Sequence, residues 1–224
     1  MIESLLKEFP HDQIIEALLP FFTEERVEII ETVLKRRISS AHVAIEKPYD
    51  IHNGLAVVRT AEALGVNHVH FINAQMKKGQ GKGTTKGTLK WTHLYKHPSL
   101  SEFLEKNRGK LLVGAAAEGS VSLSDVPIER PICFLFGNEK EGLSKEAEEA
   151  CDLLFHVPMF GMVESYNLSV AAAITLYDVV SRKREELGKE GDLSGKELLE
   201  EKARYYVRSI GIEQALEIIK RYLS

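Results

Sequence analysis

The sequence has few cysteines and no long apolar segment. Its two cysteines, Cys133 and Cys151, belong to no CxxC pair, so a zinc site and a disulfide framework are both disfavoured and a reducing cytosol fits. No run of about 18 apolar residues occurs, and the N-terminus, with Glu3, Lys7 and Glu8, lacks the apolar core of a signal peptide. We therefore expect a cytoplasmic protein with no membrane span and no bound metal.

An excess of positive charge is also missing. The 224 residues include 29 lysines and arginines against 33 aspartates and glutamates, which gives a formal net charge of −4. This balance argues against a histone-like protein coated in positive charge. It does not exclude nucleic acid, because local patches set the field near a binding site.

Basic residues gather in two places. The first is a glycine-rich segment, residues 76–90, which contains five lysines and no acid. Its lysines are Lys77, Lys78, Lys82, Lys86 and Lys90. The second is Lys35, Arg36 and Arg37, at the end of a predicted helix. The first set can be a plain solvated loop and the second can complement a helix dipole. Alternatively, both bind RNA phosphates, which releases counterions.

Short apolar runs alternate with helix-like segments through the middle of the chain. The expected strands are 41–45, 69–72, 111–116, 132–136 and 153–157. Helices are expected to begin near Asn53, Ser99, Ser144 and Asn167. This alternation predicts βα units, and hence an α/β fold with a mostly parallel sheet flanked by helices.

Both ends of the chain have the polar and apolar spacing of surface helices. We therefore expect three parts: an N-terminal helical extension (1–38), a central α/β domain (39–183) and a C-terminal helical extension (184–224). About 150 residues are enough for the central domain to bury a core of its own.

Three polar turns, each after an apolar strand-like run, point to one composite site. They are Asn53–Arg59 (NGLAVVR), Phe136–Gly142 (FGNEKEG) and Val157–Asn167 (VPMFGMVESYN). The third turn leads directly into an apolar helix, which puts Asn167 at or near the N-cap. There its side chain, or the free backbone N–H groups behind it, can face a ligand.

Taken singly, the residues of these turns have plainer interpretations. Arg59 can pair with Glu62 on its own helix, Asn53 can be an N-cap, and Glu139 and Ser165 can be ordinary turn residues. A nucleotide loop is not supported, because neither GxGxxG nor GxxxxGK[ST] occurs. The combination of the three turns is what indicates a function.

Together, the three segments resemble the motifs of the SpoU branch of the SPOUT RNA 2′-O-ribose methyltransferases, in order and in approximate spacing. The resemblance covers roughly residues 23–183. Within the branch, the segment from Met159 to Asn167 is similar to the TrmH-type enzymes, which methylate guanosine-18 in the tRNA D-loop. Tyr166 departs from the leucine that is common in the family.

The resemblance implies a fold feature and an assembly that spacing does not reveal. It implies a deep trefoil knot over roughly residues 132–180 and a homodimer whose active site is completed across the interface. It also implies S-adenosylmethionine as cofactor and tRNA as partner. Alternatives are methylation of ribosomal RNA or of another tRNA position, and a non-catalytic RNA-binding protein.

Site residues follow from the same resemblance. The implied catalytic residues are Arg59, Asn53, Glu139, Ser165 and Asn167. The implied cofactor-binding residues are Ala117, Gly137, Val157, Met159 and Leu168. Arginine is an awkward base because its side chain stays protonated in nearly every setting. Arg59 therefore either loses its proton only in the RNA complex, or stays charged and clamps a phosphate.

Overall fold

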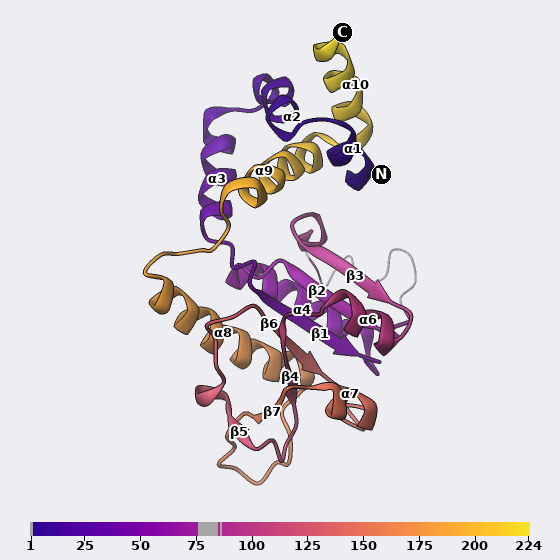
Figure 1. The fold of residues 1–224 in the computed structure, drawn as a ribbon, viewed down its shortest axis with the longest axis vertical. Helices are drawn as coiled ribbons and strands as arrows, with labels where there is room; N and C mark the ends of the chain where they lie inside the picture. Colours follow the sequence, from indigo (N-terminus) through magenta and orange to yellow (C-terminus); the bar gives the residue numbers. More distant parts are fainter. Residues whose placement is uncertain (1, 76–84, 86) are drawn as a thin grey trace. The chain divides into compact units, whose positions relative to one another are not determined.

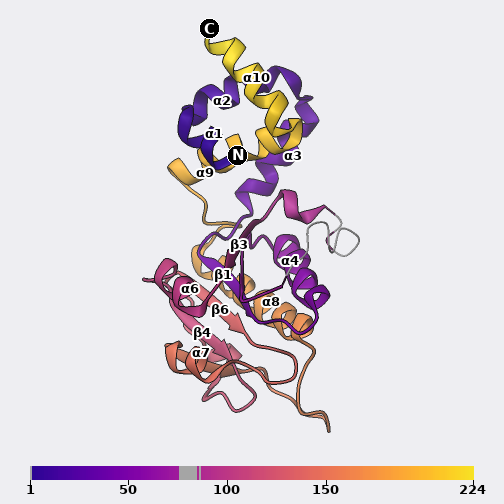
Figure 2. The same cartoon turned by 90° about the vertical axis from the view of Figure 1, so that its right-hand side faces the viewer.

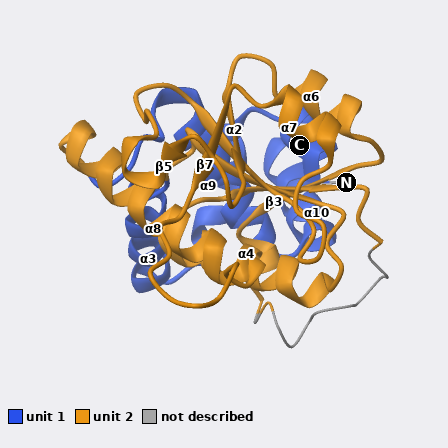
Figure 3. Cartoon of the chain, turned by 90° about the horizontal axis from the view of Figure 1, so that it is seen from below, with its two compact units in different colours: residues 1–37, 190–224 blue, residues 38–189 orange. Residues whose placement is uncertain are grey.

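The chain forms two compact units in the computed structural model, which describes residues 2–75, 85 and 87–224. One unit comprises residues 1–37 and 190–224, and the other comprises residues 38–189 (Figure 3). The two terminal segments, which we expected as separate extensions, therefore belong to one unit. The α/β unit runs on past residue 183 because its last helix ends only at Leu187, where Gly188 adopts the left-handed conformation of a C-cap.

The helical unit is built around α9 (Gly195–Ile210), which contacts α1, α2, α3 and α10. The other elements of this unit are α1 (Ile2–Glu8), α2 (His11–Leu18), η1 (Leu19–Phe21), α3 (Glu24–Lys35) and α10 (Ile212–Leu223). Thr23 caps α3 by accepting a hydrogen bond from the Arg26 N–H, which satisfies one of the free donors at the helix start. Figure 1 shows the first and last segments of the chain lying together in this unit.

The α/β unit contains a seven-stranded sheet among the described residues, and every strand pair in it is parallel. The strand order is β3-β2-β1-β6-β4-β7-β5. The strands are β1 (Ala41–Glu46), β2 (His68–Ile72), β3 (His93–His97), β4 (Leu111–Ala115), β5 (Val121–Ser122), β6 (Ile132–Phe136) and β7 (Leu153–His156). The parallel sheet predicted from the alternation of apolar runs is confirmed.

Helices cover both faces of this sheet (Figure 2). On one face, α4 (Ile51–Leu64) and α8 (Leu168–Leu187) pack together, and Leu55, Leu176 and Phe134 belong to the main core between helices and sheet. On the other face lie α6 (Leu100–Lys106) and α7 (Lys145–Ala150), where Phe103 and Ala147 form a smaller core. Burial on both faces explains why the central strands read as continuous apolar runs. The remaining turns of this unit are η2 (Thr88–Lys90) and η3 (Leu123–Asp125).

Helix starts follow side-chain caps, with one difference from the expectation. Ser99, Ser144 and Asn167 cap α6, α7 and α8 as predicted. The helix expected to begin at Asn53 begins instead at Ile51, because Asp50 accepts the hydrogen bond from the His52 N–H. Asn53 thus lies in the first turn, where its amide is free to bind other groups. Within the described ranges, no helix is long and apolar enough to cross a membrane.

Candidate active site

Three loops meet at the carboxyl edge of the sheet. β1 and β6 are neighbouring parallel strands, with Ile45 opposite Phe136, so the loops that follow them start side by side. The third loop follows β7 and leads into α8. Ligands of open parallel sheets bind at this edge, and the side chains described below come from all three loops.

Asn53, Glu139 and Asn167 form a continuous hydrogen-bonded chain. Asn53 Nδ2 donates to Glu139 Oε1 at 2.9 Å, and Asn53 Oδ1 accepts from Asn167 Nδ2 at 3.3 Å. Asn167 Oδ1 in turn accepts from the backbone N–H and the hydroxyl of Ser169, at 2.9 and 2.7 Å. Both ends of each amide are used, so the two asparagine side chains are held in one orientation.

Glu139 anchors this chain as an anion. Its Oε2 accepts a hydrogen bond from the Tyr49 N–H at 2.7 Å. Burial alone would raise the pKa of Glu139, but hydrogen bonds from the Asn53 amide and from backbone N–H groups outweigh burial and lower it. An ionised carboxylate only accepts hydrogen bonds, so Glu139 orients Asn53 and does not supply a proton.

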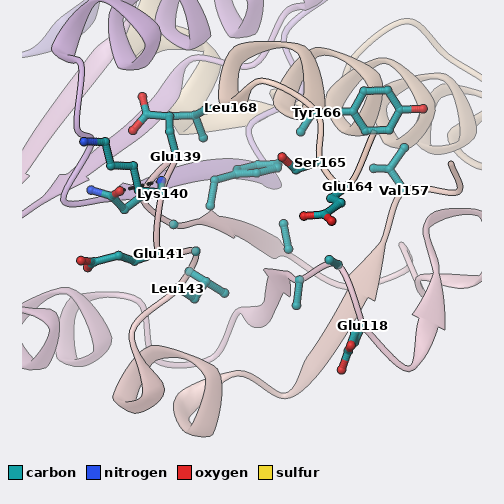
Figure 4. Close-up of a pocket in the computed structure, with 18 of the residues that line it drawn as sticks. Glu118, Glu139, Lys140, Glu141, Leu143, Val157, Glu164, Ser165, Tyr166 and Leu168 are labelled. Carbon is teal, nitrogen blue, oxygen red and sulfur yellow. Dashed lines mark hydrogen bonds between the residues drawn. The ribbon is translucent and has the colours of Figure 1, made fainter. Parts of the chain in front are cut away.

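A cavity of about 520 Å³ opens beside Glu139 (Figure 4). Its volume is within the range of about 300–1,000 Å³ typical of small-molecule sites. In Figure 4, Glu139, Lys140 and Glu141 lie on the left of the cavity, and Ser165 and Tyr166 lie on the opposite side. Five of its lining residues are those predicted for cofactor binding: Ala117, Gly137, Val157, Met159 and Leu168.

Glycine is required at the turn that lines this cavity. A Cβ on Gly137 would lie 2.0 Å from the backbone carbon of Gly142. Asn138 and Gly142 exchange two backbone hydrogen bonds of 2.8 Å, which close the turn. Asn138 Nδ2 also donates to the Lys47 carbonyl at 2.8 Å, so the loop after β6 is fixed to the loop after β1.

Sequence reasoning missed Glu46, the last residue of β1, which contacts the same region. This carboxylate is buried and accepts hydrogen bonds from the Ser144 N–H at 2.9 Å and the Ser144 hydroxyl at 2.7 Å. Ser144 also caps α7, so Glu46 fixes the end of the loop that carries Glu139. The one signal in the sequence was a carboxylate ending an otherwise apolar strand.

The acidic side chains near the cavity do not form a metal site. Glu118, Glu141, Glu148 and Glu164 line the cavity. Across the ranges that the structure describes, no group of three or more His, Cys, Asp or Glu side chains is arranged to hold a metal ion.

Arg59 is not joined to the cluster within one chain. It is exposed on α4 and forms no hydrogen bond or ion pair with the described residues. Six residues separate it from Asn53, which on an α-helix corresponds to about 240° of rotation and about 9 Å of rise. Of the five predicted catalytic residues, three share the hydrogen-bonded chain and Ser165 lines the cavity, whereas Arg59 belongs to neither. Arg59 also forms no ion pair with Glu62, which was the plainer interpretation of its position.

The residues predicted to bind RNA divide into three groups. Lys77, Lys78, Lys82 and Lys86 lie outside the described residues. Lys35, Arg36 and Lys90 are exposed, and Arg36 forms a 3.1 Å ion pair with Glu190. Arg37 is buried at 1% exposure, because its guanidinium donates twice to the Tyr205 hydroxyl inside the helical unit. The structure therefore gives Arg37 a place in the fold and no access to RNA.

Comparison with known proteins decides the family. Residues 40–177 match the SpoU rRNA Methylase family, and this span includes all three loops of the site. The chain belongs to this family. The matched span contains the loops that carry Asn53, Glu139 and Asn167.

Relatives of this SpoU methylase resemble it over most of their length. It is 34% identical over 205 residues to the tRNA (guanosine(18)-2'-O)-methyltransferase of Aquifex aeolicus, covering 90% of this chain and 95% of that protein. The crystal structure of the A. aeolicus TrmH/SpoU tRNA modifying enzyme is similar with a TM-score of 0.73 and 32% identity, over 84% of this chain and 98% of that one.

A further solved structure was determined with AdoMet. The SpoU methyltransferase AviRb from Streptomyces viridochromogenes, in complex with that cofactor, is similar with a TM-score of 0.58 and 25% identity. The similarity covers 67% of this chain and 62% of AviRb.

Proposed function

We propose that this protein transfers a methyl group from S-adenosylmethionine to the ribose 2′-hydroxyl of guanosine-18 in tRNA. The observation that carries the proposal is the hydrogen-bonded chain from Asn167 through Asn53 to Glu139, which joins three distant turns beside a ligand-sized cavity. Each amide nitrogen keeps a second hydrogen, and the Asn53 amide oxygen keeps a second lone pair, for a sugar hydroxyl.

A tRNA substrate is favoured over ribosomal RNA by the A. aeolicus relative. That protein is named for guanosine-18 of tRNA, and the match spans 205 residues, more than the α/β unit contains. The similarity therefore extends into the helical unit, which lies outside the part of the chain that matches the family. Because tRNA is made and used in the cytoplasm, we also propose a cytoplasmic location.

The cavity fits an adenosyl group by size and by lining. Ala115, Ala116 and Ala117 leave room for a flat ring, and a side chain at Gly137 would fill part of the turn. Backbone N–H and C=O groups of these loops would recognise the edge of adenine, with Val157 and Leu168 against its faces. When bound there, S-adenosylmethionine supplies an electrophilic methyl group on a sulfonium.

The protein's own contribution is to position the acceptor hydroxyl and weaken its hold on its proton. Asn53 is oriented by Glu139 and Asn167, so it presents a fixed amide to the ribose. Such positioned polar groups need no reorganisation during the reaction. Ser165, which lines the cavity, would fix the third loop around the acceptor.

We assign Arg59 to the RNA backbone next to the reacting ribose. A planar guanidinium can bind a phosphate with two parallel hydrogen bonds and can stabilise developing negative charge on the 2′-oxygen. Arg59 is exposed and without a partner among the described residues of its own chain, which leaves it available for this contact. Lysine cannot reproduce the planar fork, so Arg59→Lys should lose most turnover.

A homodimer would bring Arg59 of one protomer to the site of its partner. α8 exposes an apolar stripe, with Val170 at 44% and Tyr177 at 66% exposure, and packs beside α4, which carries Arg59. A stripe of this kind on a packed helix is typical of a protein interface. Sedimentation of the protein as a monomer at assay concentrations would contradict this arrangement.

We also propose the knot over residues 132–180. Its support is the close approach of the segment before β5 to β7, where a Cβ on Gly119 would lie 2.3 Å from the backbone carbon of Phe155. His156 Nδ1 hydrogen-bonds the Gly119 carbonyl at 2.7 Å at the same place. A crystal structure traced through both segments would decide the threading.

RNA binding is assigned to the exposed basic residues. Lys35, Arg36 and Lys90 are exposed, and the other four lysines of the glycine-rich segment join them in this proposal. Phosphate contacts of this kind make affinity fall steeply with salt. An affinity for tRNA that does not change between low and high salt would remove the assignment.

The activity is tested by incubating the protein with labelled S-adenosylmethionine and unmodified tRNA, then mapping the methylated nucleoside. We expect 2′-O-methylguanosine at position 18, and loss of it in Arg59→Lys. Label at another position, or only in ribosomal RNA, would support the alternative substrates. RNA binding without any methyl transfer would indicate a non-catalytic RNA-binding protein.

A further inference from the structure

An aromatic ring and an ammonium group stand together at the edge of the catalytic cluster, and neither has a role in the steps above. Tyr49 lies in the loop after β1, and its side chain is 66% exposed. Lys140, from the loop after β6, places its Nζ 3.7 Å from the centre of the Tyr49 ring. This cation–π pair is the one ring contact that Tyr49 makes with the described residues.

The pair is fixed to the catalytic residues through the backbone. The Tyr49 N–H donates to Glu139 Oε2 at 2.7 Å, and Glu139 also orients Asn53. The Lys140 N–H donates to Asn138 Oδ1 at 2.8 Å, while Asn138 Nδ2 holds the loop of Tyr49 through the Lys47 carbonyl. The backbones that carry the ring and the ammonium are therefore held beside the catalytic residues by hydrogen bonds.

The backbone that leads to Tyr49 is also restricted before any ligand binds. Lys47 adopts a left-handed backbone conformation, with φ at 44°. The next residue is Pro48, whose pyrrolidine ring restricts its own φ. Asp50 then caps α4. An exposed aromatic ring on a rigid loop loses little entropy when it binds.

Stacking of a nucleobase is the use that suits this pair. Single-stranded RNA is recognised by bases stacked on aromatic side chains, next to cations that bind the phosphates. An apolar surface of a protein partner would instead suit a tyrosine ring that has no charged lysine over one of its faces. With one face covered by Lys140, the opposite face of Tyr49 remains for a base.

We propose that Tyr49 and Lys140 form a stacking platform for a base of the RNA next to the reacting ribose. Tyr49 receives the base and Lys140 binds the adjoining phosphate. This inference rests on the proposed function, because it needs an RNA whose ribose lies beside Asn53. Tyr49 and Lys140 act as positioning residues and take no part in the transfer itself.

The test compares Tyr49→Ala, Tyr49→Leu and Tyr49→Phe in the full-length protein with tRNA as substrate. Loss of stacking should raise the KM for tRNA about five- to hundredfold in the Ala and Leu variants, since one base–aromatic stack contributes about that much. The Phe variant should stay within about twofold of wild type. Affinity for S-adenosylmethionine, measured without RNA, should stay unchanged in all three.

A matched control is Tyr222→Ala, another exposed tyrosine, 52% exposed on α10, which should leave the KM unchanged. If the wild type methylates tRNA and Tyr49→Ala keeps the wild-type KM, the platform is wrong while the proposed function stands. A wild type that methylates no RNA refutes the proposed function instead. A Phe variant as poor as the Ala variant, or an Ala variant that changes the oligomeric state, would also overturn the platform.

Lys140 is tested separately by the salt dependence of tRNA binding. Lys140→Gln removes one phosphate contact, so the slope of log affinity against log salt should fall by about one. An unchanged slope would contradict the assignment of Lys140 to a phosphate.

Discussion

At the scale of single residues, one glycine decides whether the cavity can form. Gly137 starts the turn after β6, and a Cβ there would lie 2.0 Å from Gly142 backbone carbon and 2.1 Å from its oxygen. Backbone atoms cannot move aside as a flexible side chain can. The turn must therefore open if any side chain is added.

Gly137→Ala should lower the free energy of unfolding by about 3 kcal/mol, at the upper end for overpacking, and abolish binding of S-adenosylmethionine. Thermal unfolding and cofactor titration measure both effects. Gly161→Ala is the control, because nothing lies within 4 Å of its Cβ position. Its stability should stay within about 0.5 kcal/mol of wild type. Similar losses in both variants would contradict the role of the tight turn.

Glu139→Gln tests whether the carboxylate orients Asn53. Glutamine would bring an NH2 group toward one of two donors, the Asn53 amide or the Tyr49 N–H. A charged hydrogen bond contributes about 1.5–3 kcal/mol, so kcat should fall about ten- to hundredfold while the fold is kept. Glu149→Gln, an exposed carboxylate on α7, should match wild type. Full activity in Glu139→Gln would refute the anchoring role.

The sequence predicted which residues belong to the site better than it predicted which contacts they make. Asn53, Glu139 and Asn167 belong to recognisable motifs, and Asn167 is the cap that its position before an apolar run predicts. Glu46 and Tyr49 could not be found in this way. Their importance depends on what packs against them from residues about 90 or more positions away, which no local pattern records.

At the scale of elements, the three strands β1, β2 and β3 share a line of buried histidines. His42 Nδ1 lies 2.9 Å from His70 Nε2, and His70 Nδ1 lies 3.0 Å from His97 Nε2. Phe103 of α6 covers the rings of His70 and His97. Burial is the main cause that lowers the pKa of all three, and it brings the pKa of His70 to about 2.

The buried histidines predict that the free energy of unfolding falls in mild acid. Imidazoles of the unfolded chain bind protons near pH 6.5, whereas the buried ones stay neutral, so lowering the pH favours the unfolded state. His70 alone should reduce the free energy of unfolding by about 2 kcal/mol between pH 7 and pH 5. Urea unfolding followed by the fluorescence of Trp91, the single tryptophan, measures this in the α/β unit.

His70→Gln should weaken the pH dependence, because the glutamine cannot take up the proton. Equal stability of the wild type at pH 7 and pH 5 would contradict the neutral, buried state of the three histidines.

One of these strands was not predicted from the sequence. β3 (HLYKH) was missed because its polar and basic residues do not form an apolar run. Its final histidine, His97, is buried only by the elements that pack against it.

At the scale of the whole molecule, the helical unit is acidic. Residues 1–37 and 190–224 contain 11 lysines and arginines against 15 aspartates and glutamates. Two of the arginines are buried and serve the fold: Arg37 binds Tyr205, and Arg204 binds Glu3, Glu200 and Glu201. Charge counts from sequence therefore overstate the cations that RNA can reach in this unit.

Arg204→Met should destabilise the helical unit by about 3–5 kcal/mol, because it removes a buried guanidinium that forms ion pairs with Glu3, Glu200 and the buried Glu201. Lys202→Met, on the same helix, removes a more exposed pair with Glu31 and should change stability by less than about 1 kcal/mol. Unfolding followed by far-ultraviolet circular dichroism compares the two. Equal effects would contradict a buried role for Arg204.

Family, sheet and site loops were all available from the sequence, whereas the union of the two chain ends was not. The alternation of strands with helices and the three motifs are local patterns, so they can be recognised from the sequence alone. The packing of α9 against α1, α2 and α3 joins segments more than 150 residues apart. No spacing in the chain encodes that contact.

The proposed reaction adds a methyl group to one sugar oxygen of tRNA. Its most direct test uses two synthetic tRNAs that differ only at position 18, one with guanosine and one with 2′-deoxyguanosine, together with labelled S-adenosylmethionine. We expect one methyl group per molecule on the first tRNA and none on the second. Equal labelling of both tRNAs, or labelling of neither, would contradict it.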